Sequence, residues 1–308
     1  MKVWIAHEAG QGLLGELPAK IEIEVYDGAG EPPSDPGDVT FWVPPVAAAA
    51  KAPDLLPKLA GLEAIQLLSA GADAWVGRVP PGVQLCDARG VHDAPVSEWV
   101  LGAAIGALRQ FPAFAQAQQR QEWAASAFTP TQELTGRRVL IVGAGSIGRA
   151  IEERLRPFDV TITRVARMAR PAEGVHGVED LPALLPDAEV AVLVVPLTEQ
   201  TRGLVDGAFL AALPDGALLI NVARGPVVDT AALLTELASG RISAALDVTD
   251  PEPLPSGHPL WRLPNVFIAP HTGGAVVGFF PRAYGLVGAQ LHRFVAGERL
   301  VNRVVGEY

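Results

Sequence analysis

The sequence has little cysteine and little lysine, and both shortages exclude whole classes of site. Cys86 is the single cysteine among 308 residues, so neither an internal disulfide nor a cysteine-rich zinc site can form. The four lysines, Lys2, Lys20, Lys51 and Lys58, all lie in the first fifth of the chain. We therefore expect no metal centre, and no lysine base or Schiff base in the rest of the chain.

Positive charge is also scarce. The formal net charge is −10, which disfavours nucleic acid or an anionic membrane as the main partner. An anionic substrate would then need local arginines rather than a general attractive field. The Tyr-x-x-x-Lys motif is missing too, because Tyr26 and Tyr284 are each followed four residues later by glycine. This excludes the short-chain dehydrogenases.

Long apolar segments are absent as well. Residues 39–50 (VTFWVPPVAAAA) are too few to cross a bilayer and are interrupted by Pro44 and Pro45. Residues 1–10 have a single lysine and a short apolar run, which is typical of a first strand rather than a signal peptide. We expect a cytoplasmic protein without membrane contact.

What is present suits a two-domain α/β protein. Hydrophobic residues make up 49% of the chain, which is long enough for two cores. The first ninety residues contain short apolar runs separated by Gly and Pro, with 55–62 as an intervening helix. Such β-rich runs are typical of a buried parallel sheet, here a flavodoxin-like domain. The expected strands are 3–6, 21–27, 39–45, 64–71 and 83–90.

A helical segment follows this first domain. Asp93 and Pro95 are typical of a helix start, and apolar residues then recur at helical spacing as far as Phe111. Pro112 should kink or restart the helix, which we expect to continue to about Trp123. This segment suits either a subunit interface or an intramolecular helix between two domains.

The second domain alternates strands with helices, one of them at 229–240, and a final helix spans about 280–296. This alternation predicts a doubly wound, Rossmann-type parallel sheet that binds ligands at the carboxyl ends of its strands. We place the substrate domain at 1–97 and 280–308, and the dinucleotide-binding domain at 98–279. The expected strands are 138–143, 159–166, 188–196, 217–223, 242–248 and 266–270.

The pattern G-x-G-x-x-G occurs twice, and only one copy has the right surroundings. At 10–15 it is separated from the preceding strand and is followed at once by Pro18, so we expect a loop. The copy at Gly143, Gly145 and Gly148 directly follows a strand and opens a helix. There the glycines permit a tight turn, close approach of backbone amides to a pyrophosphate, and close helix packing.

Three polar residues follow apolar strands downstream of this fingerprint: Arg224 in NVARG, Glu252 in DPEPLP and His271 in APHTGG. An arginine can hold a keto acid through its carboxylate and polarise the carbonyl. A histidine can protonate the carbonyl oxygen, and a carboxylate can keep it charged. These are the groups needed to reduce a 2-keto acid beside a nicotinamide. Arg224 could instead be a surface partner of Asp229, and a lone histidine is more often structural.

In this order and spacing, the motifs resemble those of the D-isomer-specific 2-hydroxyacid dehydrogenases, from about residue 64 to Asn302 and most specifically over 139–274. The resemblance implies that Arg224 binds substrate and that Glu252 pairs with His271. It also implies a homodimer with its substrate in a cleft between two domains. In this superfamily the formate dehydrogenases have glutamine in place of Glu252, so the glutamate argues against formate.

The resemblance implies further ligand contacts. The loop 67–73 matches the one whose backbone amides, here those of Ala70 and Gly71, hold the substrate carboxylate; an ordinary strand-to-helix turn is the alternative. Asp247 matches an aspartate near the nicotinamide, and residues 196–204 match a loop along the cofactor. The expected cofactor-binding residues are Gly143, Gly145, Ser146, Ile147, Gly148, Arg164, Arg167, Pro196, Thr201, Val222 and Asp247.

The cofactor predicted by these residues is NADPH rather than NADH. An NAD-specific fold has Asp or Glu after the second strand, at the position that Ala166 occupies here. Arg164, Arg167 and Arg170 lie nearby, and guanidinium groups bind phosphate in a bidentate manner. Arg167 is the main candidate for the ribose 2′-phosphate. Some of these arginines could instead be solvated surface groups, and NAD stays possible.

The sequence therefore predicts an NADPH-linked reductase of glyoxylate or hydroxypyruvate. One alternative is a short-type 3-phosphoglycerate dehydrogenase, for which Arg78 is the obvious cation in the first domain. Another is a non-catalytic NAD(P)-sensing corepressor on the same fold. The substrate side chain is not specified by the sequence.

Overall fold

A computed structural model describes residues 1–46, 51–128 and 130–306. The chain forms two compact units, Met1–His92 with Val276–Tyr308, and Asp93–Ala275. The borders lie at 92/93 and 275/276, whereas the sequence placed them at 97/98 and 279/280. Helix α2 (Asp93–Leu108) is continuous from Asp93, so its whole length belongs to the second unit.

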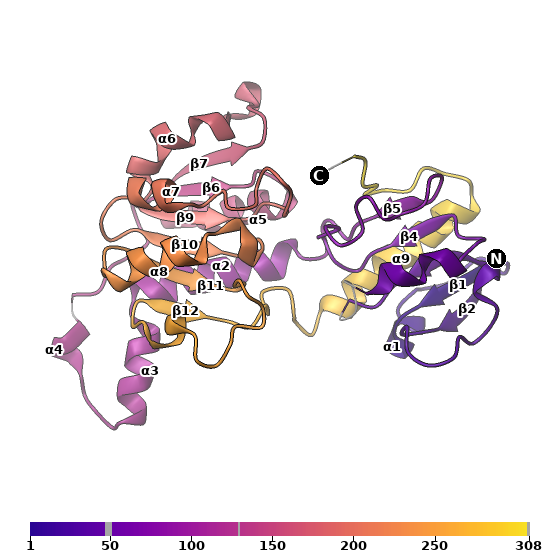
Figure 1. The fold of residues 1–308 in the computed structure, drawn as a ribbon, viewed down its shortest axis with the longest axis horizontal. Helices are drawn as coiled ribbons and strands as arrows, with labels where there is room; N and C mark the ends of the chain where they lie inside the picture. Colours follow the sequence, from indigo (N-terminus) through magenta and orange to yellow (C-terminus); the bar gives the residue numbers. More distant parts are fainter. Residues whose placement is uncertain (47–50, 129, 307–308) are drawn as a thin grey trace. The chain divides into compact units, whose positions relative to one another are not determined.

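The first unit contains a parallel sheet with the strand order β2-β1-β3-β4-β5 (Figure 1). This is the flavodoxin-like order of the doubly wound folds, in which ligands bind at the carboxyl edge of the strands. The sequence predicted all of these strands. Their bounds are β1 Lys2–Ile5, β2 Glu22–Val25, β3 Val39–Val43, β4 Ala64–Gln66 and β5 Gln84–Cys86.

Helix α9 (Phe279–Val295) covers one face of this sheet and buries Tyr284 and Leu291 against it. The other face includes Trp4 and Trp42 and packs on Trp75 and on a 3₁₀ helix (Ala52–Lys58), where the sequence predicted a helix at 55–62. Of the apolar segment 39–50, the first five residues form β3, and residues 47–50 lie outside the described part of the chain.

The first glycine pattern has a packing role. A short helix, α1 (Glu8–Gln11), begins there, and a Cβ on Gly10 would lie 2.3 Å from the ring of Tyr284. Gly15 has φ 74°, in the left-handed region that glycine adopts readily. The segment therefore packs on α9, which fits the prediction that this copy is not a dinucleotide loop.

The second unit contains a parallel sheet with the order β12-β11-β10-β9-β6-β7-β8. The chain reverses direction across the sheet between β6 and β9, which makes the carboxyl ends of these strands the expected ligand site. The sequence missed β8, a three-residue strand that contains His176 and Gly177. The bounds are β6 Arg138–Val142, β7 Thr161–Ala166, β8 Val175–Gly177, β9 Val190–Leu193, β10 Leu218–Asn221, β11 Ser243–Leu246 and β12 Val266–Ile268.

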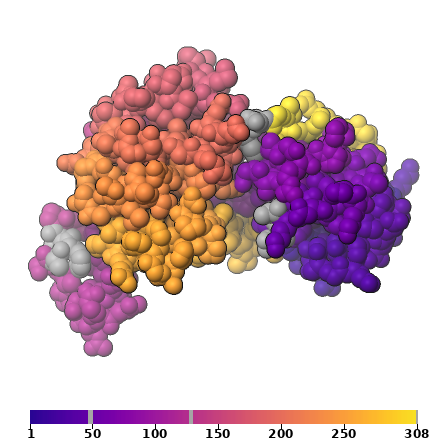
Figure 2. Space-filling view, viewed as in Figure 1, coloured from indigo at the N-terminus to yellow at the C-terminus, as the bar shows by residue number. Residues whose placement is uncertain are grey.

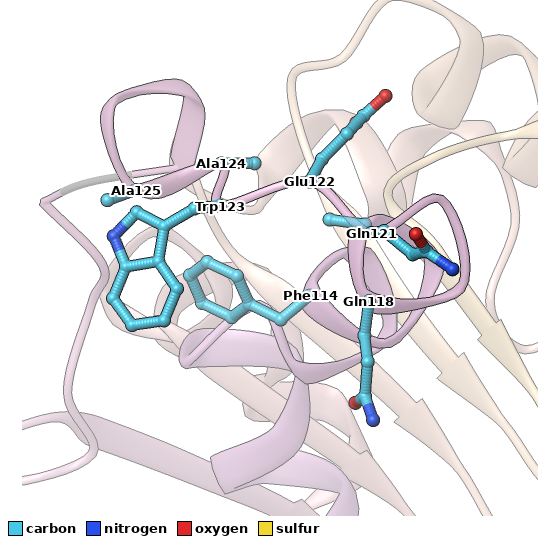
Figure 3. Close-up of a pocket in the computed structure, with 8 residues that line it drawn as sticks. Phe114, Gln118, Gln121, Glu122, Trp123, Ala124 and Ala125 are labelled. Atoms are coloured by element: carbon cyan, nitrogen blue, oxygen red, sulfur yellow. The ribbon is translucent and has the colours of Figure 1, made fainter.

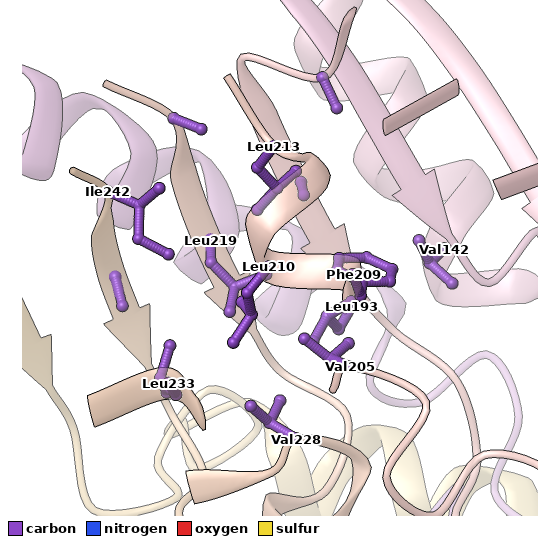
Figure 4. Packing of buried hydrophobic residues seen from close by; sticks show 14 of the residues in the cluster. Val142, Leu193, Val205, Phe209, Leu210, Leu213, Leu219, Val228, Leu233 and Ile242 are labelled. Carbon is purple, nitrogen blue, oxygen red and sulfur yellow. The ribbon is translucent and has the colours of Figure 1, made fainter. Parts of the chain in front are cut away.

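Both faces of this sheet are covered by helices, as a doubly wound fold requires. One core includes Phe209 and Leu210 of α7 and Leu233 of α8 (Figure 4). The other core joins α2 and α5 to alternate residues of the same strands. The helix bounds are α5 Ser146–Leu155, α6 Leu181–Leu184, α7 Gly207–Ala212 and α8 Thr230–Ala238.

Two further helices, α3 (Phe111–Gln119) and α4 (Ala125–Phe128), project from the second unit as an arm (Figures 1 and 2). The predicted restart of the helix at Pro112 is confirmed, whereas its predicted extension to Trp123 is wrong. Gln110 has φ 60° and interrupts the helix after α2, Pro112 lies in the first turn of α3, and α3 ends four residues before Trp123. Proline fits a first turn because the N–H it lacks has no helical partner there.

The arm exposes large apolar side chains. Trp123 is 97% exposed and Phe111 57%. Between α3 and α4 lies a hollow of about 530 Å³, with the Phe114 ring and the Trp123 indole at one end and Gln118 and Gln121 along its wall (Figure 3).

No helix among the described residues combines the length and apolarity needed to span a bilayer. Over the same residues, no His, Cys, Asp and Glu side chains gather in a group that could hold a metal ion.

Candidate active site

Arg224, Glu252 and His271 follow three neighbouring strands of the second sheet. Arg224 lies three residues after β10, Glu252 is in the segment after β11, and His271 lies three residues after β12. Strands β10, β11 and β12 are adjacent and parallel, so their carboxyl ends share one edge. The fold therefore brings the three predicted residues to the same edge of one sheet.

The Arg224 turn is held by a side chain that the sequence analysis did not single out. Asn221, at the end of β10, is buried; its amide donates to the Arg224 carbonyl and accepts from the Ala223 N–H. A Cβ on Gly225 would lie 1.9 Å from the Thr249 carbonyl oxygen, so only glycine allows this turn to contact the segment after β11. A polar residue ending a buried strand was the available signal for Asn221.

Glu252 and His271 form a hydrogen-bonded pair. Nδ1 of His271 lies 2.7 Å from Oε1 of Glu252, and both side chains are a little under half exposed, at 46% and 41%. A carboxylate on Nδ1 fixes the tautomer, so that Nε2 is the nitrogen offered to a ligand. The pair has the arrangement of a general acid with its orienting group.

Asp247 supports the backbone at His271. The His271 N–H donates to the Asp247 carbonyl, and the N–H groups of Thr272 and Gly273 donate to its carboxylate at 2.8–3.0 Å. Burial raises the pKa of Asp247, while these N–H groups act in the opposite direction. His271 has φ 54°, a strained conformation for a residue other than glycine, and Asp247 holds it in place.

The glycine fingerprint has the geometry of a dinucleotide cradle. Gly143 has φ 123°, and a Cβ there would lie 2.4 Å from the Val194 carbonyl oxygen. A Cβ on Gly148 would lie 1.9 Å from the Gly143 carbonyl oxygen, which sets how closely α5 approaches β6. A Cβ on Gly145 would meet no protein atom within 4 Å. Gly145 therefore leaves space beside the first turn of α5, where a pyrophosphate can approach backbone amides.

The start of α5 is tied to α2 by a contact that the sequence did not reveal. The Ser146 hydroxyl donates to Oδ2 of Asp93, while Oδ1 of Asp93 is buried without a hydrogen-bond partner. Ile147 is partly buried and packs on the core shared with α2. Residues with the geometry to hold a dinucleotide are therefore present at this helix N-terminus.

Three other predicted cofactor residues lie on loops at the carboxyl edge of the sheet. The Thr201 hydroxyl donates to the Pro196 carbonyl at 2.6 Å and closes the loop after β9. Val222 directly follows β10, and its N–H donates to the Leu193 carbonyl.

The arginines in β7 and just after it have different environments. Arg164 lies 3.1 Å from Oε2 of Glu152, a buried carboxylate on α5, and also donates to the Glu173 carbonyl. Arg170 donates to the carbonyl of Ala144, inside the fingerprint. Arg167 is exposed. Arg164 is thus engaged in the fold, and Arg167 is an exposed residue just beyond the end of β7.

The predicted carboxylate loop lies in the first unit, after β4. Ala70 and Gly71 are partly buried, and the Ser69 hydroxyl donates to the Gly71 carbonyl at 2.8 Å. Nε2 of His92 lies 3.0 Å from the Leu68 carbonyl oxygen at the start of the same loop. The hydroxyl of Ser69 bridges the turn, so the Gly71 carbonyl has a partner within the loop.

Residues 101–273 match the family described as D-isomer specific 2-hydroxyacid dehydrogenase, NAD binding domain. The glyoxylate/hydroxypyruvate reductase A of Serratia proteamaculans is 31% identical over 280 residues, which cover 87% of this chain and 84% of that protein.

Solved structures are similar over nearly the whole chain. One is a D-isomer specific 2-hydroxyacid dehydrogenase from Xanthobacter autotrophicus in complex with NADPH and MES, with a TM-score of 0.83, 31% identity and coverage of 99% and 97% of the two chains. Another is an NADPH-dependent glyoxylate/hydroxypyruvate reductase from Sinorhizobium meliloti in complex with NADP and sulfate, with a TM-score of 0.84, 26% identity and 98% coverage of both chains.

Proposed function

The chain belongs to the D-isomer-specific 2-hydroxyacid dehydrogenases, and from that premise we propose that it reduces glyoxylate or hydroxypyruvate with NADPH to the D-2-hydroxy acid. The observation that carries the proposal is the Glu252–His271 pair, at the sheet edge where Arg224 also lies. The pair supplies a proton donor, and Arg224 supplies an anion-binding group at the same edge of the sheet.

His271 protonates the carbonyl oxygen of the keto acid through Nε2, the ring nitrogen that does not contact Glu252. The glutamate keeps the imidazole in one orientation and stabilises its charged form. In the reverse direction the same nitrogen accepts the proton of the hydroxyl group, since one group serves both directions of a proton transfer. Asp247 maintains the turn that presents His271.

We propose that Arg224 binds the substrate carboxylate and, for the first unit, that the backbone amides of Ala70 and Gly71 are donors to an anion. A guanidinium forms two parallel hydrogen bonds with a carboxylate, which fixes the orientation of the keto group as well as binding it. Asn221 holds the turn from which Arg224 projects. Arg224 is partly buried, which strengthens its interaction with an anion.

Bound NADPH supplies the hydride. Gly143, Gly145, Ser146, Ile147 and Gly148 would hold its pyrophosphate at the N-terminus of α5. The loop with Pro196 and Thr201, together with Val222 and Asp247, would line the remainder of the cofactor.

The preference for the 2′-phosphate rests on Ala166, where a carboxylate would select NADH, and on Arg167. The NADPH dependence of the Sinorhizobium meliloti enzyme supports this part of the proposal. Arg164 contributes less to binding of the 2′-phosphate, because Glu152 and the Glu173 carbonyl already engage its guanidinium group.

The protein is proposed to act as a homodimer in which the arm of α3 and α4 contacts a second copy of the chain. Trp123 and Phe111 are exposed on this arm, and large aromatic side chains are typical anchors of protein interfaces. Sedimentation velocity should give a dimer for the wild type and a monomer for Trp123→Glu. A wild-type monomer would contradict this part of the proposal.

The function is tested by initial rates of NADPH and NADH oxidation with glyoxylate, hydroxypyruvate and pyruvate. We expect turnover of the first two, faster with NADPH. Cofactor binding without turnover of any keto acid would identify the corepressor alternative. Oxidation of 3-phosphoglycerate in preference to these acids would identify the phosphoglycerate dehydrogenase alternative.

A further inference from the structure

Asp93 joins the first turns of two helices in the second unit. It lies in the first turn of α2, and its Oδ2 accepts the hydroxyl hydrogen of Ser146, the first residue of α5. Both residues belong to the same compact unit, Asp93–Ala275. A helix N-terminus is electropositive, so two of them can stabilise this carboxylate in place of a cation.

The Asp93 carboxylate has few partners. Its Oδ1 is buried and accepts no hydrogen bond. Over the described part of the chain, no lysine or arginine forms an ion pair with this carboxylate. A buried acceptor without a partner destabilises a folded chain, so stability does not explain why a carboxylate is present at this position.

The N-terminus of α5 is the place proposed above for the pyrophosphate of the cofactor. Its N-cap, Gly145, has no capping side chain, and the Arg149 N–H donates to the Gly145 carbonyl at 3.1 Å. The N–H groups of the three residues before Arg149 have no partner within the helix and can bind an anion. The Asp93 carboxylate is therefore a second anion at the same helix end.

The Ser146 hydroxyl cannot serve both anions at once. A serine hydroxyl has one hydrogen, and Ser146 donates it to Asp93. A pyrophosphate at this helix end gains no hydrogen bond from the hydroxyl until the contact with Asp93 breaks. The two negative groups also repel each other, since both lie at the first turn of α5.

We propose that Asp93 competes with the cofactor pyrophosphate for Ser146 and the N-terminus of α5, and so weakens cofactor binding and speeds cofactor exchange. The inference rests on the proposed function and names a residue that sets cofactor affinity within it. Asp93 acts equally on NADPH and NADH, because the pyrophosphate is common to both. Arg167, by contrast, is proposed to contact the 2′-phosphate, which only NADPH has.

The test measures Kd for NADPH and NADH by isothermal titration calorimetry in the wild type, Asp93→Asn and Asp93→Ala. Asparagine keeps the size of the side chain but removes its charge. Asp93→Asn should therefore lower both Kd values by about three- to tenfold, the value of a hydrogen bond or a nearby charge. Asp93→Ala also removes the acceptor and frees the Ser146 hydroxyl, so the decrease should be at least as large. Stopped-flow displacement should show slower dissociation of NADPH from both variants.

Two matched controls separate this effect from a general change in charge. Glu98→Gln removes a negative charge from the same helix, but the Glu98 side chain is 69% exposed and lies 3.7 Å from Arg154. Glu98→Gln should leave both Kd values unchanged. Adenosine 2′-monophosphate has the 2′-phosphate but no pyrophosphate, so its Kd should be the same in the wild type and Asp93→Asn.

A purely structural role for Asp93 predicts the opposite sign, because a loosened first turn of α5 would bind the cofactor more weakly. Unchanged or higher Kd values in Asp93→Asn and Asp93→Ala would overturn the inference while leaving the proposed function intact. An equal decrease for adenosine 2′-monophosphate would also overturn it. Absence of binding of either nucleotide by the wild type would instead overturn the proposed function, and this inference with it.

Discussion

Arg164 and Glu152 form an ion pair, with Nη1 of the arginine 3.1 Å from Oε2 of the glutamate. The glutamate lies on α5, the helix that opens at the fingerprint, and Arg156 contacts its other oxygen at 2.8 Å. Two guanidinium groups thus neutralise a buried carboxylate beneath the dinucleotide cradle. This arrangement separates the structural contribution of Arg164 from the recognition that we propose for Arg167.

Replacing the two arginines should have different effects. Arg167→Ala should raise KM for NADPH by roughly ten- to a hundredfold, through loss of charged hydrogen bonds to the 2′-phosphate, and leave KM for NADH unchanged. Arg164→Ala should lower the free energy of unfolding by about 1–3 kcal/mol, since it removes a partner from buried Glu152. Steady-state kinetics with both cofactors and urea denaturation measure these effects. An unaltered cofactor preference in Arg167→Ala would rule out its assigned role.

Alanine substitutions at two glycines of the fingerprint should have different effects. Gly145→Ala should fold normally, because the new methyl group meets no protein atom, but should raise KM for the cofactor about tenfold by blocking access to the amides. Gly148→Ala should lower the free energy of unfolding by about 1–3 kcal/mol, since its methyl group overlaps the Gly143 carbonyl. Thermal unfolding and cofactor titration distinguish the two. Tight cofactor binding by Gly145→Ala would contradict the proposal that Gly145 leaves space for the pyrophosphate.

Glu252→Gln should lower turnover of glyoxylate while leaving KM for NADPH unchanged. The amide is nearly isosteric with the carboxylate but has no charge to stabilise the imidazolium. Initial rates across pH measure the effect, and the loss should be present over the whole range in which the wild type is active. Wild-type turnover in this variant would show that the contact between Glu252 and His271 is structural.

The pKa of His7 gives a prediction about pH. Burial lowers it below 6.5 in the folded protein, whereas the unfolded chain has the ordinary value, so the unfolded state binds more protons between the two values. The stability contributed by a neutral His7 is therefore present above pH 6.5 and is lost as the pH falls through the folded-state pKa. An NMR titration of the imidazole should show a midpoint below 6.5. A midpoint at or above 6.5 would contradict the burial of the His7 ring as the cause that lowers its pKa.

The sequence predicted the fold class because its strands are continuous apolar runs bounded by Gly and Pro. It missed β8 because three residues, one of them Gly177, carry too little pattern to indicate a strand. A break was predicted at Pro112, but the left-handed conformation of Gln110 was not, because glutamine is a good helix former and this conformation is imposed by its surroundings.

Contacts between residues that are distant in the sequence limited how much of the site could be predicted. The spacing of Arg224, Glu252 and His271 after their strands predicted that they share one sheet edge, and the structure places them there. The pairing of Arg164 with Glu152 could not be predicted, because it depends on how a turn of α5 faces a strand residue twelve positions later in the sequence. The Asn221 contacts, by contrast, lie within four residues and could have been inferred from a polar side chain ending a buried strand.

The central claim is that His271 supplies the proton for reduction of the keto group. Its most direct test is NADPH consumption with glyoxylate by the wild type and His271→Ala, with His258→Ala as control, since His258 instead caps a short 3₁₀ helix. We predict that His271→Ala lowers turnover by roughly 10²–10⁴ while cofactor binding survives and His258→Ala turns over normally. Near-normal turnover in His271→Ala would contradict the account.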